Sequence, residues 1–99
     1  MSWTLNVRPA ASKDIAAAYR WYEQRQQGLG KQFLDAVEAA FQRIAAKPEL
    51  YPCILRDARR ALVRGFPYSI FFRVRGDEVR VLGVIHQHRH PQHWMRRLQ

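Results

Sequence analysis

The sequence is poor in cysteine and contains no long apolar run. It has a single cysteine, Cys53, among 99 residues, so no internal disulfide can form, as is typical of cytosolic proteins. No second thiol is present to form a redox pair, and we expect Cys53 to be a buried or half-buried structural thiol and not a nucleophile. No apolar run reaches the roughly 18 residues of a membrane span, and residues 1–4 lack the features of a signal peptide. These absences predict a cytoplasmic protein without a membrane partner.

Acidic residues are also scarce, above all in the second half of the chain. Seventeen Lys and Arg stand against eight Asp and Glu, a net charge of +9. Residues 1–50 contribute +2 and residues 51–99 contribute +7, and every basic residue of the second half except the histidines is arginine. The planar guanidinium group suits phosphate and carboxylate. We therefore expect the second half to face nucleic acid or an acidic protein segment; a basic surface without a partner is the plain alternative.

The length predicts one domain over residues 1–99. A chain of this size hides about 60–65% of its unfolded surface, which allows one core. With 47% hydrophobic and 25% charged residues, the composition is that of a globular domain and not of a disordered chain.

The first half predicts a strand and two helices. Residues 3–8 alternate apolar and polar side chains, as in a short strand, which Pro9 should end. Ser12 is a candidate helix cap with Asp14 in the first turn, and apolar residues at helical spacing predict a helix over residues 12–26. They are Ile15, Ala18, Tyr19 and Tyr22.

Gly28 and Gly30 should end that helix and turn the chain. A second helix is predicted over residues 31–46, ended by Pro48. Its apolar stripe comprises Phe33, Val37, Ala40, Phe41 and Ile44. Two amphipathic helices joined by a short turn form a hairpin whose stripes need a sheet to cover.

The second half predicts a loop over residues 48–57 and strands over residues 60–64, 68–75 and 78–86, the last two joined at Gly76-Asp77. Alternation along residues 68–75 directs Tyr68, Ile70, Phe72 and Val74 to the helices, and Ser69, Phe71, Arg73 and Arg75 to a cationic face. The result is an α+β fold of order β-α-α-β-β-β, with the helical hairpin packed on a small twisted antiparallel sheet.

The tail is rich in histidine. His86, His88 and His90 alternate and would share one face of an extended segment, a possible metal site together with His93. Pro91 disrupts the segment, and no carboxylate or cysteine adjoins it in the sequence. We therefore predict solvated histidines, no metal and no cofactor.

Aromatic and arginine side chains are the candidate contacts of a partner. Trp21 lies off the apolar stripe of its helix and is an interface candidate. Phe71 falls on the cationic face, where a partner or the C-terminal tail can cover it. Trp94 is expected to pack the tail onto the domain, with Arg96 and Arg97 solvated at a frayed end. The predicted binding residues are Trp21, Arg64, Phe71, Arg73, Arg75 and Trp94.

Several motifs occur in a characteristic order: Trp21-Tyr22-Glu23, Gly28-Leu29-Gly30 with Phe33, Pro48-Glu49-Leu50-Tyr51-Pro52, residues 60–68 and residues 81–86. In this order, over nearly the whole chain, they resemble the ParE/RelE superfamily of bacterial type II toxins. The best match is the ParE side, the plasmid-stabilisation toxins, whose last strand runs into histidine, basic residues and a Pro-x-x-Trp-like ending. Residues 86–94 are similar to that ending.

This resemblance implies a toxin neutralised by an antitoxin that is encoded alongside it and wraps it with a C-terminal segment. ParE-type toxins act on DNA gyrase, trapping it on cleaved DNA, whereas RelE-type relatives cut mRNA on the ribosome. We favour the gyrase inhibitor, which needs a binding surface and no catalytic residues. An inactive or plain nucleic-acid-binding relative is a third alternative.

The RelE-type endoribonuclease remains open as an alternative. Such an enzyme activates a ribose 2′-hydroxyl, stabilises a pentacoordinate phosphate and protonates a leaving oxygen. In this chain no tyrosine follows Tyr68, but histidine can replace it as the acid because its ordinary pKa is near 6.5. The positions that match the family's catalytic residues are Arg60, Arg64, Arg73, Arg80, His86 and His88.

Overall fold

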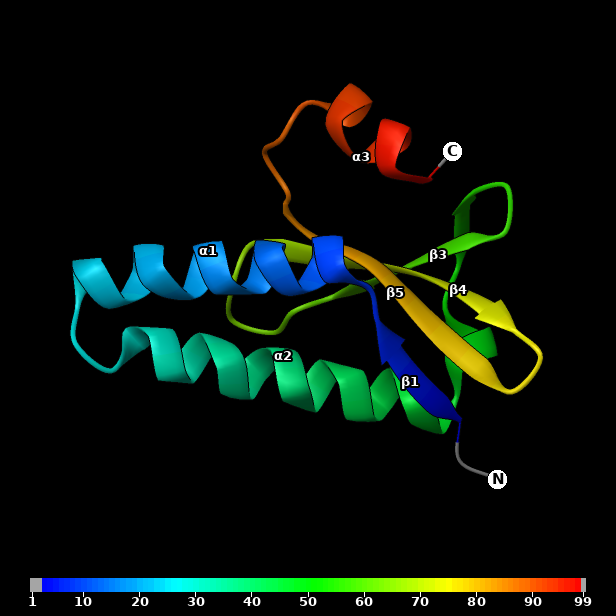
Figure 1. Cartoon of the computed structure of the whole chain (residues 1–99), viewed down its shortest axis with the longest axis horizontal. Coiled ribbons are helices and arrows are strands. Elements are labelled where there is room, and N and C mark those ends of the chain that lie inside the picture. The colour runs from blue at the N-terminus through cyan, green and yellow to red at the C-terminus, as the bar shows by residue number, and fades with distance from the viewer. Residues whose placement is uncertain (1–2, 99) are drawn as a thin grey trace.

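The computed structural model describes residues 3–98. Figure 1 shows two long helices side by side and a third, short helix set apart from them across the sheet. In chain order the elements are β1 (Thr4–Val7), α1 (Pro9–Arg25), α2 (Leu29–Ala46), a 3-10 turn η1 (Pro48–Leu50), β2 (Cys53–Leu55), β3 (Ala58–Leu62), β4 (Tyr68–Arg75), β5 (Glu78–His86) and α3 (Pro91–Leu98). Within residues 3–98, every helix is too short or too polar to cross a membrane.

The five strands form one sheet in the order β1-β5-β4-β3-β2. The pairs within β2 to β5 are antiparallel, as predicted, but β1 pairs with β5 in parallel, with Leu5 opposite Val79. The expectation of a wholly antiparallel sheet was therefore wrong at one edge. Strand β1 is separated from β5 by the α1–α2 hairpin and three strands, and a connection of that length allows the two strands to lie parallel.

One face of the sheet packs against the α1–α2 hairpin. Ile70 and Phe72 of β4 are fully buried there, together with Phe33 of α2 and Val81 of β5. The prediction that Tyr68, Ile70, Phe72 and Val74 face the helices is confirmed. Burying one such large apolar side chain contributes about 1.5–3 kcal/mol to folding.

The other face is covered in part by α3, which the sequence did not predict. Phe71 and Ile85 are buried there against Leu98, and the rings of Phe71 and Trp94 stack with centroids 5.3 Å apart. Trp94 thus packs the tail onto the sheet, as expected. Pro91 does not break this segment, because a proline is suited to the first position of a helix.

The predicted start of α1 was three residues late. The helix begins at Pro9, and the residue before it, Arg8, makes no side-chain cap. Ser12 is therefore inside the helix, and Asp14 lies beyond its first turn. Proline carries no amide hydrogen to satisfy and has a helix-compatible φ, so α1 can begin without a hydroxyl cap.

The loop predicted over residues 48–57 contains the short edge strand β2. Cys53 is exposed in this strand, contrary to the expected burial, because β2 has a strand neighbour on one side only. Strand β3 ends at Leu62, two residues earlier than predicted, because the chain turns at Arg64 and Gly65, where Gly65 has φ 84°.

The turn between the two long helices is held by Glu23. Its carboxylate accepts hydrogen bonds from the amides of Gly28 and Gly30 at 3.0 Å, so a side chain of α1 satisfies the amides at the start of α2. Gly28 has φ 89°, and Gly30 lies against the Tyr19 ring. A β-carbon added at Gly30 would lie 2.8 Å from that ring and 2.9 Å from the Glu23 carboxylate.

We expect Gly30→Ala to destabilise the protein by about 1–3 kcal/mol, because the added methyl group overpacks the turn and disturbs the Glu23 cap. Urea unfolding measures the difference. Glu38→Ala, at an exposed position of the same helix, is the control and should change stability by roughly 0.5 kcal/mol or less. A Gly30→Ala protein as stable as the wild type would show that the helices separate here at little cost.

Candidate functional site

A broad hollow of the described surface lies between α1, the adjoining ends of β4 and β5, and the segment that leads into α3 with its first turn. It has a volume of about 580 Å³, and we call it the α1 groove. Helix α1, the two strand ends and the segment after β5 each supply part of its lining: Asp14, Ala17, Ala18, Trp21, Tyr22, Pro67, Tyr68, Val84, Ile85, His86, Arg89 and His93.

Aromatic side chains form much of the groove wall. Trp21 is 50% exposed, its ring covered by the Arg25 guanidinium group at 4.3 Å from the ring centroid. Tyr22 meets Trp21 edge to face and also contacts Tyr68. Burial raises the pKa of both tyrosines, so at neutral pH their hydroxyls are uncharged hydrogen-bonding groups beside apolar rings.

The end of the groove near β5 is basic. His86 packs edge to face against Tyr68 and His88, with ring centroids 5.1 Å apart in each case. Burial, followed by the charges of His88 and Arg89, lowers the pKa of His86 below its ordinary 6.5, so its imidazole is neutral at pH 7. Arg89 and His93 line the same end.

Asp14 is the one acid among the described residues that line the groove, and it is already paired with Arg97. An aromatic wall beside basic side chains suits a segment that carries both apolar and acidic residues.

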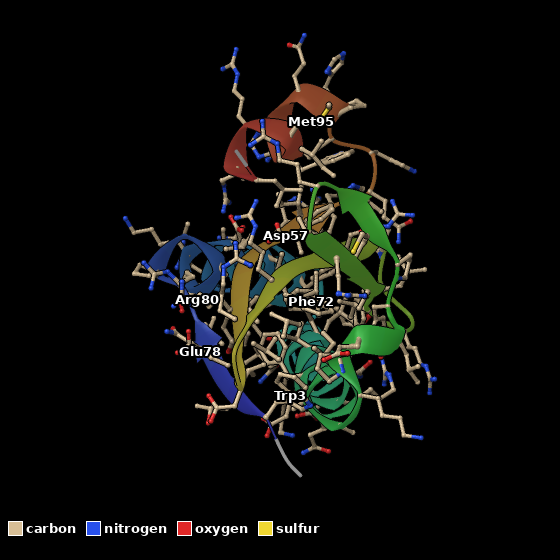
Figure 2. All side chains as sticks on the ribbon, turned by 90° about the vertical axis from the view of Figure 1, so that its right-hand side faces the viewer. Trp3, Asp57, Phe72, Glu78, Arg80 and Met95 are labelled. Carbon is tan, nitrogen blue, oxygen red and sulfur yellow. The ribbon has the colours of Figure 1, made fainter. Side chains whose placement is uncertain are left out.

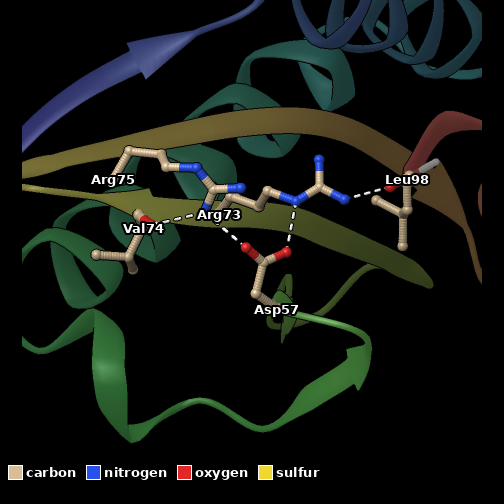
Figure 3. Close-up of polar contacts among 5 residues, drawn as sticks. All are labelled: Asp57, Arg73, Val74, Arg75 and Leu98. Atoms are coloured by element: carbon tan, nitrogen blue, oxygen red, sulfur yellow. Dashed lines mark hydrogen bonds and ion pairs between the residues drawn. The ribbon is translucent and has the colours of Figure 1, made fainter.

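The predicted cationic face is partly neutralised from within the chain. Asp57 accepts hydrogen bonds from Arg73 Nε at 2.7 Å and from Arg75 Nη1 at 2.6 Å, as Figure 3 shows. Arg73 also donates to the backbone oxygen of Leu98. The hydrogen bonds from Arg73 and Arg75 lower the pKa of Asp57 to about 2. Arg73 and Arg75, both predicted binding residues, are thus held together by one carboxylate.

Two other predicted arginines lie away from this cluster. Arg80 bonds to the carboxylate of Glu78, beside which it lies in Figure 2. That bond, helped by one from Asn6, lowers the pKa of Glu78. Arg64 is exposed in the turn between β3 and β4.

Of the residues predicted for an endoribonuclease, Arg60 and His86 come together. Both line a second cavity of about 50 Å³, along with Ser69, Gln87, Phe71 and Trp94. His88 lies next to His86 and is exposed. The structure therefore places Arg60 and His86 at this cavity with His88 beside them, Arg73 in the Asp57 cluster, and Arg64 and Arg80 at two separate surface positions.

The remaining predicted contacts are Trp21, Phe71 and Trp94. Trp21 lies in the α1 groove. Phe71 is 2% exposed beneath Trp94, which agrees with the alternative that the tail covers it. Within residues 3–98, no group of three or more His, Cys, Asp or Glu side chains is placed to hold a metal ion.

The sequence did not single out Asp14, Tyr68, Arg89 or Asp57 as site residues. Asp14 was assigned to the helix dipole and Tyr68 to the core. Only folding brings α1 beside the end of β5 and directs Asp57 at two arginines of β4, so no local pattern identified these four.

Comparison with known proteins places this chain in a family. A family model described as "ParE toxin of type II toxin-antitoxin system, parDE" matches residues 5–91. The chain belongs to the ParE toxin family. Among curated proteins, no sequence matches it. The resemblance to ParE/RelE toxins inferred from the sequence motifs is thereby confirmed.

Two solved structures share the fold of this ParE-family chain. The chromosomal ParDE toxin–antitoxin system of P. aeruginosa aligns with a TM-score of 0.65 and 21% identity, over 86% of this chain and 96% of that one. The RelBE2 toxin–antitoxin complex of Mycobacterium tuberculosis aligns with a TM-score of 0.63 and 21% identity, over 87% and 99%. These likenesses confirm the α+β fold, here with three helices on a mixed sheet.

We expect Asp57→Asn to lower stability at neutral pH by roughly 1 kcal/mol or less, because the pairs with Arg73 and Arg75 are half-exposed. The Asp57 pKa is about 2 when folded, against an ordinary 3.8. Its contribution is therefore complete above about pH 4 and is lost as the pH falls through 2. Thermal unfolding from pH 7 to pH 2 should show the wild type and variant converging.

Asp77→Asn, at an exposed acid of the β4–β5 turn, is the control and should leave the pH profile of the wild type unchanged. A constant difference between Asp57→Asn and the wild type down to pH 2 would contradict a role for the ionised Asp57 carboxylate.

Proposed function

We propose that this ParE-family toxin inhibits DNA gyrase and is neutralised by an antitoxin encoded beside it. The family match supports the toxin assignment. Gyrase inhibition needs a binding surface and no reacting side chain, and the α1 groove together with the arginine-rich second half supplies such a surface.

The observation that carries this proposal is the state of the sheet arginines. Arg73 and Arg75 share Asp57, and Arg80 is paired with Glu78. An endoribonuclease needs cationic groups directed at a developing phosphate charge, in reach of an acid and a base. Here two of the four arginines predicted for an endoribonuclease, Arg73 and Arg80, bond instead to carboxylates of the chain, which favours recognition over catalysis.

The α1 groove is the proposed antitoxin site. Its aromatic wall at Trp21, Tyr22 and Tyr68 offers apolar contact, and Arg89 and His93 stand on its basic side. An amphipathic segment with apolar residues on one face and acidic residues on the other is complementary to both. The aligned ParDE and RelBE2 structures are toxin–antitoxin systems, which supports a partner of this kind.

One observation favours the endoribonuclease as a second candidate. Arg60 and His86 line the same small cavity, and the lowered pKa of His86 provides a neutral imidazole at pH 7 that can accept a proton. This pair is the part of the predicted ribonuclease set that the fold assembles.

We expect expression of the chain in bacteria to arrest growth, and the purified protein to block gyrase supercoiling while mRNA stays intact. Growth curves, a plasmid supercoiling assay and mRNA integrity in the arrested cells measure the three effects. Adding the purified antitoxin should restore supercoiling. Arrest with cleaved mRNA that His86→Ala abolishes would move the assignment to the endoribonuclease, and absence of arrest would contradict both.

We expect Trp21→Ala to weaken antitoxin binding by about 2 kcal/mol or more, because a half-exposed tryptophan in a groove is a typical interface anchor. Isothermal titration with the purified antitoxin measures the affinity. Leu50→Ala is the matched control, since Leu50 is apolar and 76% exposed but does not line the groove. Equal affinities for the two variants would place the antitoxin elsewhere.

A further inference from the structure

The end of the chain is held by an arginine that was expected to be solvated. Arg97 Nη2 lies 2.6 and 2.7 Å from the two carboxylate oxygens of Asp14, and its Nη1 donates to the Leu82 carbonyl at 2.9 Å. Its side chain is 25% exposed. Arg97 therefore joins α3 to both α1 and β5 through directed, charge-assisted hydrogen bonds.

Asp14 connects this contact to the α1 groove. The carboxylate lines the groove, and one of its oxygens also accepts a hydrogen bond from the Val84 amide at 2.9 Å. Two donors from different elements thus fix its position. Because Arg97 neutralises Asp14, the one acid lining the groove does not repel an acidic segment that enters it.

Gly83 provides the space for this pair. A β-carbon added there would lie 3.2 Å from Arg97 Nη1 and 3.4 Å from Asp14 Oδ2. Any side chain at this position of β5 would crowd the guanidinium group. Glycine at this strand residue thus leaves the Arg97–Asp14 pair in place, whereas an added β-carbon would require it to shift by a few tenths of an ångström.

Further contacts hold α3 against the sheet. The Trp94 ring stacks on Phe71, Leu98 is 1% exposed, and Arg73 donates to the Leu98 carbonyl, as Figure 3 shows. The docked helix in turn fixes the segment before it. That segment supplies Arg89, and the first turn of α3 supplies His93, to the wall of the groove.

We propose that Arg97 is a positioning residue for the α1 groove, and that docking of α3 and binding of an acidic partner segment stabilise each other. The proposal rests on the antitoxin site proposed above. Arg97 does not line the groove, but it holds α3 so that Arg89 and His93 stand where acidic side chains can meet them. A partner that contacts these two residues binds the docked form more tightly.

The expected effect follows from linkage. If only a fraction of the toxin has α3 docked, the apparent dissociation constant rises by the inverse of that fraction. The coupling is reciprocal, so a bound partner raises the docked fraction by the same factor. Removing the Arg97–Asp14 contact should therefore weaken binding and make α3 depend on the partner for its order.

The test compares Arg97→Ala, Arg97→Lys and the control Arg96→Ala, an exposed position of the same helix. The probe is the purified full-length antitoxin encoded beside the toxin. Its dissociation constant is measured by titration, and amide exchange of residues 92–98 is followed in the free and bound toxin. Thermal unfolding confirms that each variant is folded.

We expect Arg97→Ala to raise the dissociation constant on the order of tenfold, with α3 amides that exchange rapidly in the free toxin and are protected in the complex. Arg97→Lys should recover part of the affinity, because it restores the positive charge beside Asp14 but not the two-pronged hydrogen bond. Arg96→Ala should match the wild type in both measurements.

Five outcomes would overturn the proposal. If Arg97→Ala binds the antitoxin with unchanged affinity although its α3 amides exchange rapidly, the groove does not need the docked helix. If α3 exchange is unchanged in Arg97→Ala, Arg97 does not hold α3 in place. Tighter binding by Arg97→Ala would mean that a basic residue of the partner forms an ion pair with the Asp14 carboxylate. If the α3 amides lose protection from exchange when the antitoxin binds, binding opposes docking of α3, which is the reverse of the proposed coupling. A wild-type toxin that binds no antitoxin would overturn the proposed function as well.

Discussion

Strand β4 is apolar on both faces, and the rest of the structure depends on covering both. Ile70 and Phe72 face the α1–α2 hairpin, whereas Phe71 faces α3. Leaving any of these side chains in water would cost about 1.5–3 kcal/mol, a large part of the stability of a small domain. A single helical layer covers one face only, so the chain needs a second cover, and its last eight described residues supply it. The α1 groove lies where these two covers approach each other.

Acidic residues are few, and three of them hold arginines in defined places. Asp57 holds Arg73 and Arg75, Glu78 holds Arg80, and Asp14 holds Arg97. Exposed pairs of this kind add little stability, typically 0–1 kcal/mol. Their consequence is positional. The carboxylates offset positive charge at Arg73 and Arg75, at Arg80 and at Arg97, while Arg89 keeps its charge at the end of the groove. The uneven charge of the sequence thus becomes a local charge pattern beside an aromatic wall.

Periodicity predicted most of the architecture because each helix and strand of the main core buries one continuous stripe. The two helices, the three central strands and the division of β4 into two faces all follow from that rule. The errors at β1 and in the tail fall where a non-local contact outweighs the local pattern. Pro91 ends an extended segment but begins a helix well, and the helix it begins buries the apolar ring of Phe71 beneath Trp94. The parallel pairing of β1 depends likewise on which strand edge is open.

The candidate site was harder to predict than the fold. Trp21 could be chosen because it lies off its apolar stripe, and the arginines because they are numerous. The carboxylate with which each arginine pairs could not be predicted, because an ion pair between distant residues produces no periodic pattern in the sequence. Asp57 and Asp14 are ordinary acids in the sequence, and they become organising residues only when β4 and the C-terminal helix are brought to them.

By itself, the sequence determined the order of the elements, the faces of the central strand, the excess of positive charge in the second half and the resemblance to the ParE/RelE toxins. These properties are set by composition, by spacing along the chain or by motif order, which a linear sequence records. Only the tertiary structure decided that the tail is a docked helix, that Asp14 links this helix to the groove, and that the sheet arginines are paired within the chain. Each of these depends on residues up to 83 positions apart, and their contact exists only after the hydrophobic core has fixed the distance between them.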